Sequence, residues 1–287
     1  MKKKIKYLLL LICVFMLSGC IDKDSMENIN VYTSLYPIEY VTNELYGKHA
    51  NISSFYPNDT NPYTYKLTNK QIKDYSKGNL IVYNGLDKEK DYIVDMINNN
   101  KNLKIIDASA RIEYTNTMDE IWINPSNLLT VAQNVRNGLK EYVTSTYLKK
   151  EIDNNYDKLK LEISTVDAEM KEMVQNAENK TIIVSSNDFN FLSKYGFNII
   201  SLDDNTITDK IISDTKKLIA AKNVNYIFVK KDEKLNNTIK NIKQTYPDIE
   251  IIEIDPLNSI STEDKNNKKD YISIMYENID KLKKELY

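Results

Sequence analysis

The chain has 287 residues, of which 41% are hydrophobic and 28% are charged, a mixture typical of a globular protein with one large or two ordinary domains. Its six glycines include no GxGxxG run and no GxxxxGK run followed by Ser or Thr, which excludes the common backbone cradles for dinucleotides and triphosphates. The single histidine, His49, excludes chemistry that needs two imidazoles.

The beginning of the chain has the pattern of a secretory signal peptide. Four lysines precede an apolar run over residues 7–17, which is too short to span a bilayer as a stable helix. The run ends in the sequence LSGC, which resembles a bacterial lipobox, where the cysteine receives a diacylglycerol before cleavage. We therefore expect residues 1–19 to be removed and Cys20 to anchor the protein on the outer side of the cell membrane. The alternative is a chance cysteine in an ordinary secretory signal.

The charge of the remaining chain limits its partners. Four of the 39 basic residues and none of the 41 acidic residues lie in the leader, so the rest has a net charge of −6. This acidic balance argues against a nucleic-acid partner and against electrostatic binding to anionic lipid. With Cys13 removed and Cys20 acylated, no thiol remains for a disulfide. Since its charge does not favour binding to anionic lipid, we expect the protein to attach to the membrane through the lipid on Cys20.

Strand and helix patterns alternate after a polar tether over residues 20–29. Such a βαβ series predicts a parallel sheet. The expected strands cover residues 30–35, 51–55, 79–83 and 103–107, and the expected helices cover 38–46, 69–76, 92–98 and 126–147.

A heptad stripe of apolar residues follows, with charged residues on the other faces. Its 4-3-4-3-4-3-4 spacing predicts a helix of about 28 residues, roughly 40 Å long. A self-associating coiled coil is one interpretation. We favour a monomer in which one helix packs along two lobes, because a second αβ series begins directly after it. The stripe consists of Ile152, Tyr156, Leu159, Ile163, Val166, Met170, Met173 and Ala177.

The second series completes the expected fold. Its strands are predicted at residues 181–185, 198–202, 226–229 and 249–254, and its helices at 189–195, 207–221, 235–246 and 270–286. The fold class is α/β, with two lobes that each have a mainly parallel sheet flanked by helices, joined by one long helix. The expected divisions are an N-terminal lobe over 30–148, a connecting helix over 149–178 and a C-terminal lobe over 179–287.

Four short segments carry a resemblance to a known family. They read PNDTNPYTYKLT at residues 57–68, LIVYNGL at 80–86, WINP at 122–125 and IDPL at 254–257. In this order, behind a lipobox and around a long helix, they resemble segments of the solute-binding lipoproteins of zinc and manganese ABC importers, some first described as adhesins. The resemblance implies a protein that captures a metal ion between two lobes and delivers it to an ABC permease and ATPase, without catalysis.

The resemblance also implies four metal ligands, one from each of four loops, typically three histidines and a carboxylate. At the matching positions this chain has Tyr63, Glu120 and Ser186 instead of histidines, and it keeps the carboxylate as Asp255. All four follow the ends of expected strands, where open αβ sheets bind their ligands. The positions fit the family, whereas three of the residue types depart from it.

Two of these positions have close alternatives. Asp119 lies beside Glu120, and Asp188 lies two residues after Ser186, so a small shift of the alignment exchanges one for the other. Glu120 can also be a solvated loop acid, and Ser186 can be the cap of the next helix.

The donor types bear on the identity of the ion. Tyr63, Glu120 and Asp255 make an all-oxygen set, which suits Mn²⁺, Mg²⁺, Ca²⁺ or ferric iron better than Zn²⁺. The ion therefore stays open among zinc, manganese and iron. Without a metal, Tyr63 is an ordinary loop aromatic and Asp255 a turn former before proline. His49 lies outside the aligned loops and is expected at the surface.

Two functions from other classes stay open. The chain can be a surface interaction or adhesion lipoprotein whose metal site has decayed, or it can bind a chelated or organic solute, since related two-lobed folds also hold larger ligands. Enzyme activity is not expected, because no family-like catalytic constellation accompanies the acidic residues.

Overall fold

The computed structural model describes residues 24–86, 88–115 and 117–287. The leader, Cys20 and the first part of the expected tether lie outside the described residues. In the ranges that are described, no helix combines the length and the apolar character needed to cross a bilayer.

The N-terminal lobe contains a four-stranded parallel sheet with the strand order β2-β1-β3-β4. The order reverses between β1 and β3, which places a crevice at the carboxyl ends of these two strands. The strands are β1 (Ile29–Thr33), β2 (Ala50–Ser54), β3 (Leu80–Tyr83) and β4 (Lys104–Asp107), and the helices are α2 (Tyr36–Tyr46), α3 (Asn69–Tyr75) and α4 (Glu89–Asn99).

The Asn-Gly-Leu sequence after β3 forms a turn that is tied to the end of β4. The Gly85 N–H lies 3.0 Å from Asp107 Oδ1 and 2.9 Å from Ser109 Oγ, and Ser109 Oγ in turn donates to Asn84 Oδ1 at 2.7 Å. A Cβ on Gly85 would lie 1.9 Å from Asp107 Oδ2. Glycine is therefore required here for the close approach of the backbone to this carboxylate.

Three helices follow the first sheet, namely α5 (Asp119–Ile123), α6 (Pro125–Tyr142) and α7 (Thr146–Gln175). The helix expected over residues 126–147 is interrupted, because α6 ends at Tyr142 and Val143 is extended. Ser145 then caps α7 by accepting the Leu148 N–H at 3.3 Å. The β-branched and hydroxyl side chains in this stretch favour such a break over a continuous helix.

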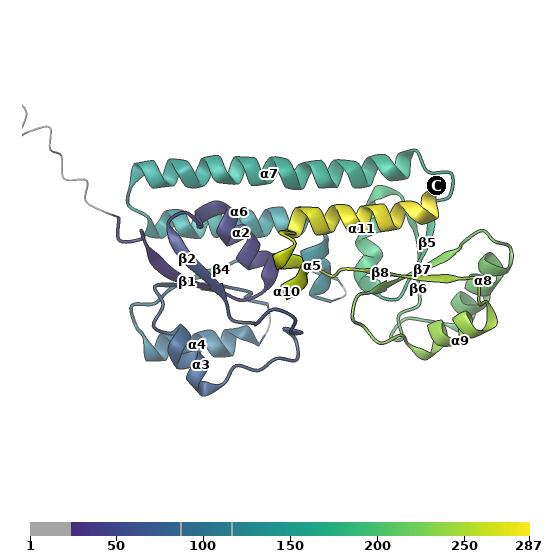
Figure 1. Ribbon diagram of the computed structural model, residues 1–287, viewed down its shortest axis with the longest axis horizontal. Helices are drawn as coiled ribbons and strands as arrows, with labels where there is room; N and C mark the ends of the chain where they lie inside the picture. Colours follow the sequence, from purple (N-terminus) through teal and green to yellow (C-terminus); the bar gives the residue numbers. More distant parts are fainter. Residues whose placement is uncertain (1–23, 87, 116) are drawn as a thin grey trace, which may run out of the picture.

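The heptad stripe from Ile152 to Met173 lies on the buried face of α7, whereas Ala177 lies beyond the end of this helix. Figure 1 shows α7 running along one side of the whole molecule, and it contacts α2 and α6 of the first half and α11 (Tyr271–Leu286) of the second. This packing supports one helix laid along two lobes rather than a coiled coil. Its buried residues are Leu148, Ile152, Tyr156, Leu159, Ile163, Val166, Met170, Met173 and Val174.

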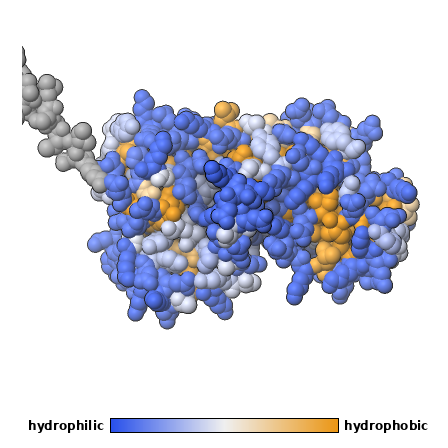
Figure 2. Space-filling model, viewed as in Figure 1, coloured by the Kyte–Doolittle hydropathy of each residue, from blue (hydrophilic) through white to orange (hydrophobic). Residues whose placement is uncertain are grey.

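The C-terminal lobe repeats the topology of the first, with a parallel sheet in the order β6-β5-β7-β8. The predicted α/β class with two parallel-sheet lobes and a long helix is therefore confirmed. Figure 2 shows a mostly hydrophilic surface with smaller apolar areas on this lobe. The remaining elements are β5 (Thr181–Val184), the 3-10 helix η1 (Asn187–Tyr195), β6 (Asn198–Ser201), α8 (Asp209–Ala220), β7 (Tyr226–Lys230), α9 (Asn237–Thr245), β8 (Glu250–Ile254) and α10 (Thr262–Asn266).

Candidate metal site

The candidate site lies between the lobes, where loops and strand ends from both sheets meet. Tyr63 comes from the loop between β2 and α3, and Asp119 begins α5. On the other side, Asp188 lies in η1 after β5, and Lys230 ends β7. Since the second sheet reverses its strand order between β5 and β7, Asp188 and Lys230 lie at its crevice.

The ammonium of Lys230 joins the two lobes. Its Nζ lies 3.1 Å from Asp119 Oδ2 and 2.9 Å from Asp188 Oδ2, while the Lys230 side chain is only 15% exposed. Burial alone would lower the pKa of Lys230, but the carboxylates of Asp119 and Asp188 outweigh burial and raise the pKa above its ordinary value. Lys230 is therefore a largely buried ammonium, favoured in its charged form and shared by one carboxylate from each lobe.

Tyr63 donates a hydrogen bond to this cluster. Its hydroxyl lies 2.6 Å from Asp119 Oδ1, and the Trp122 ring N–H donates to the same hydroxyl at 3.2 Å. Burial, followed by the charge of Asp119, raises the pKa of Tyr63 well above its ordinary value. Tyr63 is therefore held as a neutral phenol. Asn258, from the loop after β8, also donates to Asp119 Oδ1, at 2.9 Å.

Ser186 supports Asp188 in the second lobe. The Ser186 hydroxyl donates to Asp188 Oδ2 at 2.8 Å and accepts the Asp188 backbone N–H at 3.2 Å, as expected of a helix cap. Thr117, from the first lobe, donates to Asp188 Oδ1. Asp188 itself is fully buried. It is Asp188, rather than the predicted Ser186, that forms an ion pair with Lys230.

Asp255 lies in the same cleft with a lysine of its own. Its Oδ2 is 3.1 Å from the Nζ of Lys231, and its Oδ1 accepts the Leu257 N–H at 2.8 Å, which is the turn geometry expected before proline. Asp255, Tyr63 and Asp119 line one cavity of about 600 Å³. The cavity therefore collects predicted residues from both lobes.

Glu120 is not among the residues that line this cavity. Its Oε2 accepts the Thr115 N–H at 3.3 Å. Its neighbour Asp119 contacts Tyr63 and Lys230 instead.

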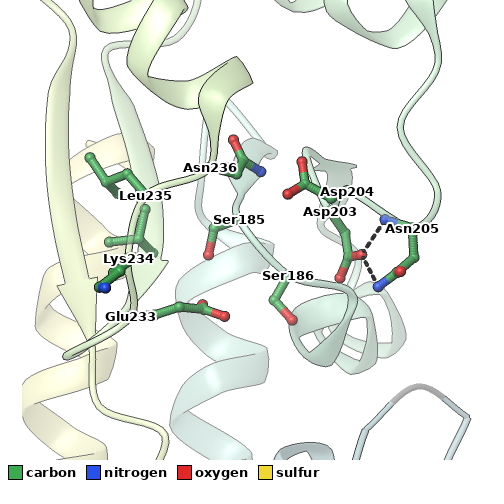
Figure 3. Close-up of a pocket in the computed structure, with 10 residues that line it drawn as sticks. Ser185, Ser186, Asp203, Asp204, Asn205, Glu233, Lys234, Leu235 and Asn236 are labelled. Atoms are coloured by element: carbon green, nitrogen blue, oxygen red, sulfur yellow. Dashed lines mark hydrogen bonds between the residues drawn. The ribbon is translucent and has the colours of Figure 1, made fainter.

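A second cavity of about 180 Å³ lies beside the site, within the C-terminal lobe (Figure 3). It is lined by Ser186, Asp203 and Glu233, among others. Asp203 Oδ1 accepts both the backbone and the side-chain N–H of Asn205, at 2.9 and 3.0 Å. Asp203 Oδ2 also accepts the Asn187 N–H at 3.1 Å, so this carboxylate joins its own loop to the start of η1.

The charges of the cleft are balanced by lysines. Across the described ranges, no group of three or more His, Cys, Asp or Glu side chains is arranged so that it could hold a metal ion.

Lys230 and Lys231 are the residues that sequence reasoning missed. The available signal was two consecutive lysines at the end of a predicted strand, on the same sheet edge as the candidate ligands.

Comparisons with known proteins agree with this fold. The family model described as zinc-uptake complex component A, periplasmic, matches residues 31–285. The zinc-binding lipoprotein AdcA of Streptococcus pneumoniae is 20% identical over 312 residues, covering 98% of this chain but 60% of AdcA, so the chain spans only part of that relative. The manganese ABC transporter substrate-binding lipoprotein scaA of Streptococcus gordonii is 27% identical over 252 residues, covering 75% of this chain and 78% of scaA.

A solved structure shows the same fold. The Zn(II)-bound ZnuA-like domain of Streptococcus pneumoniae AdcA superposes with a TM-score of 0.73 at 19% identity, covering 90% of this chain and 99% of that domain. The family match extends over nearly all of the described chain and includes every loop of the candidate site. The chain therefore belongs to the family of zinc-uptake complex component A, as the resemblance of its four segments predicts.

Proposed function

We propose that this chain is the substrate-binding lipoprotein of a metal ABC importer and captures a metal ion in the cleft between its lobes. The observation that carries the proposal is the convergence of Asp119 and Asp188, one from each lobe, on a single cation, Lys230 Nζ. A pair of carboxylates that shares one cation across the lobe boundary is also suited to bind a divalent ion. The match to the family supports this function.

The proposed ligands are Asp119 and Asp188, and Asp255 and Tyr63 would join them only after a rearrangement, because no three acidic side chains of the described ranges are arranged around one ion position. The first two already face one cation, and Asp255 and Tyr63 line the same cavity as Asp119. The sequence also predicts Glu120 and Ser186 as ligands, and their part in metal binding stays a prediction.

The relatives bear on which ion is carried. AdcA is named for zinc and scaA for manganese. The oxygen donors of this cleft favour Mn²⁺ over Zn²⁺, because carboxylates are hard ligands and no histidine or thiol is among them. We therefore propose a divalent ion as the cargo, with manganese ahead of zinc.

Titration of chelator-treated protein with Mn²⁺ and Zn²⁺ tests the proposal. We expect one ion per chain and, for Asp119→Asn, a loss of affinity of about tenfold or more, which corresponds to about 1.4 kcal/mol or more, since a charged donor is removed. Calorimetry and thermal shift measure both. The control is Asp214→Asn, which removes a carboxylate that also pairs with lysines but lies on α8, away from the cleft. Absence of binding by the parent protein would reject a metal cargo.

One observation favours a second candidate function. The cavity of about 600 Å³ is larger than a single ion needs and lies within the usual range for small organic ligands. Besides carboxylates, it is lined by Lys230, Lys231 and Lys234, which suit an anionic or chelated solute. Thermal-shift screening with metal chelates and small organic acids separates this candidate from a free ion.

We further propose that the protein is held on the outer face of the cell membrane by lipid on Cys20 and works as a monomer with a permease and its ATPase. The lipoprotein names of AdcA and scaA support the anchor. We expect Cys20→Ala to be released from the membrane fraction or to keep its leader, because the acyl chains supply the attachment. Fractionation and mass spectrometry of the N-terminus measure this, and a processed variant that stays membrane-bound would contradict it.

A further inference from the structure

We propose that Lys230 is a built-in competitor for the cargo ion, and that its ammonium must leave the carboxylate pair before a metal can bind there. This inference rests on the proposed function and names the residue that sets the affinity of the site. A competitor of this kind has to occupy the same ligands as the cargo, carry the same sign of charge and be able to move away.

Lys230 occupies the same ligand atoms that a metal would need. Its Nζ contacts Asp119 Oδ2 at 3.1 Å and Asp188 Oδ2 at 2.9 Å, so it takes one oxygen from each lobe. A divalent ion that bridges the lobes through these oxygens has to lie between them as well. Ammonium and metal therefore exclude each other at this position.

The remaining oxygens of the pair are held by neutral donors. Asp119 Oδ1 accepts from Tyr63 and Asn258, and Asp188 Oδ1 accepts from Thr117. These groups position the carboxylates but do not balance their charge. Removal of Lys230 alone would leave two buried carboxylates without the ammonium that bridges them, and this arrangement attracts a divalent cation.

Lys230 also has a direction in which to move. Its Nζ is 3.8 Å from Glu233 Oε1, and the Glu233 side chain is 46% exposed. A rotation of the flexible lysine side chain toward Glu233 would release both aspartates while keeping the ammonium paired. Glu233 and Lys230 line the same cavity, so the displaced lysine stays within the cleft.

The competition lowers the apparent affinity of the site. If the aspartates are free in only a tenth of the molecules, the apparent dissociation constant is about tenfold larger than that of the free site. The lysine also keeps the two lobes joined when no metal is bound. We therefore expect metal-free protein to keep its cleft closed and to release its ion readily.

The test compares Lys230→Met with Lys230→Arg in Mn²⁺ and Zn²⁺ titrations. Methionine keeps the length of the side chain without the charge, and arginine keeps the charge. We expect Lys230→Met to bind metal about tenfold or more tightly than the parent, and Lys230→Arg to bind no more tightly than the parent. The control is Lys194→Met, which removes a lysine that also joins the halves of the molecule, through Asn124 and Asp167, but lies outside the cleft.

The outcomes separate this inference from the proposed function. If the parent binds metal and Lys230→Met binds no more tightly, the inference is overturned and the proposed function stands. If the parent binds none and Lys230→Met does, the competitor is supported and a free metal cargo is rejected. If neither binds, both are overturned. Should Lys230→Met fold only when metal is present, the metal-dependent gain in thermal stability, absent in Lys194→Met, supports the inference.

Discussion

Asp188→Ala is expected to lower the free energy of unfolding by about 3 kcal/mol. The Asp188 side chain is fully buried and lies 2.9 Å from the ammonium of Lys230. Without it, this charge keeps Asp119 and the more distant, half-exposed Glu233 as partners, and the hydroxyls of Ser186 and Thr117 lose an acceptor. Urea unfolding followed by circular dichroism measures the change.

A double variant shows where the effect comes from. Asp188→Ala combined with Lys230→Met removes the stranded charge, so we expect it to recover part of the stability that Asp188→Ala loses. Asp214→Ala is the control for loss of an exposed, lysine-paired carboxylate and should change little. Equal instability of the single and double variants would contradict a role for the unpaired ammonium.

Trp122→Ala is expected to lower the free energy of unfolding by about 4 kcal/mol. The Trp122 side chain is fully buried beneath the site, and its ring N–H donates to the hydroxyl of Tyr63 at 3.2 Å. Alanine therefore leaves a cavity and removes the support of Tyr63 at the same time. Thermal and urea unfolding of the metal-free protein measure the loss.

Trp122→Phe separates packing from hydrogen bonding. Phenylalanine restores most of the apolar volume but, like alanine, it cannot donate to Tyr63. We expect Trp122→Phe to lose about half as much stability as Trp122→Ala, because cavity formation dominates the cost. If the two variants were equally unstable, the hydrogen bond to Tyr63 would be the main contribution instead.

Local sequence patterns were sufficient to predict the main architecture. Short apolar runs separated by helical stretches indicated two parallel sheets, because a βαβ connection requires parallel neighbours. The heptad stripe from Ile152 onward identified the long helix by its period alone, and these residues form its buried face. The break after Tyr142 and the short α5 were not predicted, because caps and single-turn helices give only weak local signals.

The composition of the site was decided by the tertiary structure. In the sequence, Asp119 lies next to Glu120 and Asp188 lies two residues after Ser186, so local patterns could not choose between the members of each pair. Only the folded loops show that Asp119 and Asp188 share a cation. The sequence signal for Lys230, two consecutive lysines at a predicted strand end, was weak, since a lysine at a strand end is usually solvated. It becomes a counter-ion because Asp188, 42 positions away in the same lobe, and Asp119, 111 positions away across the boundary between the lobes, both meet its ammonium.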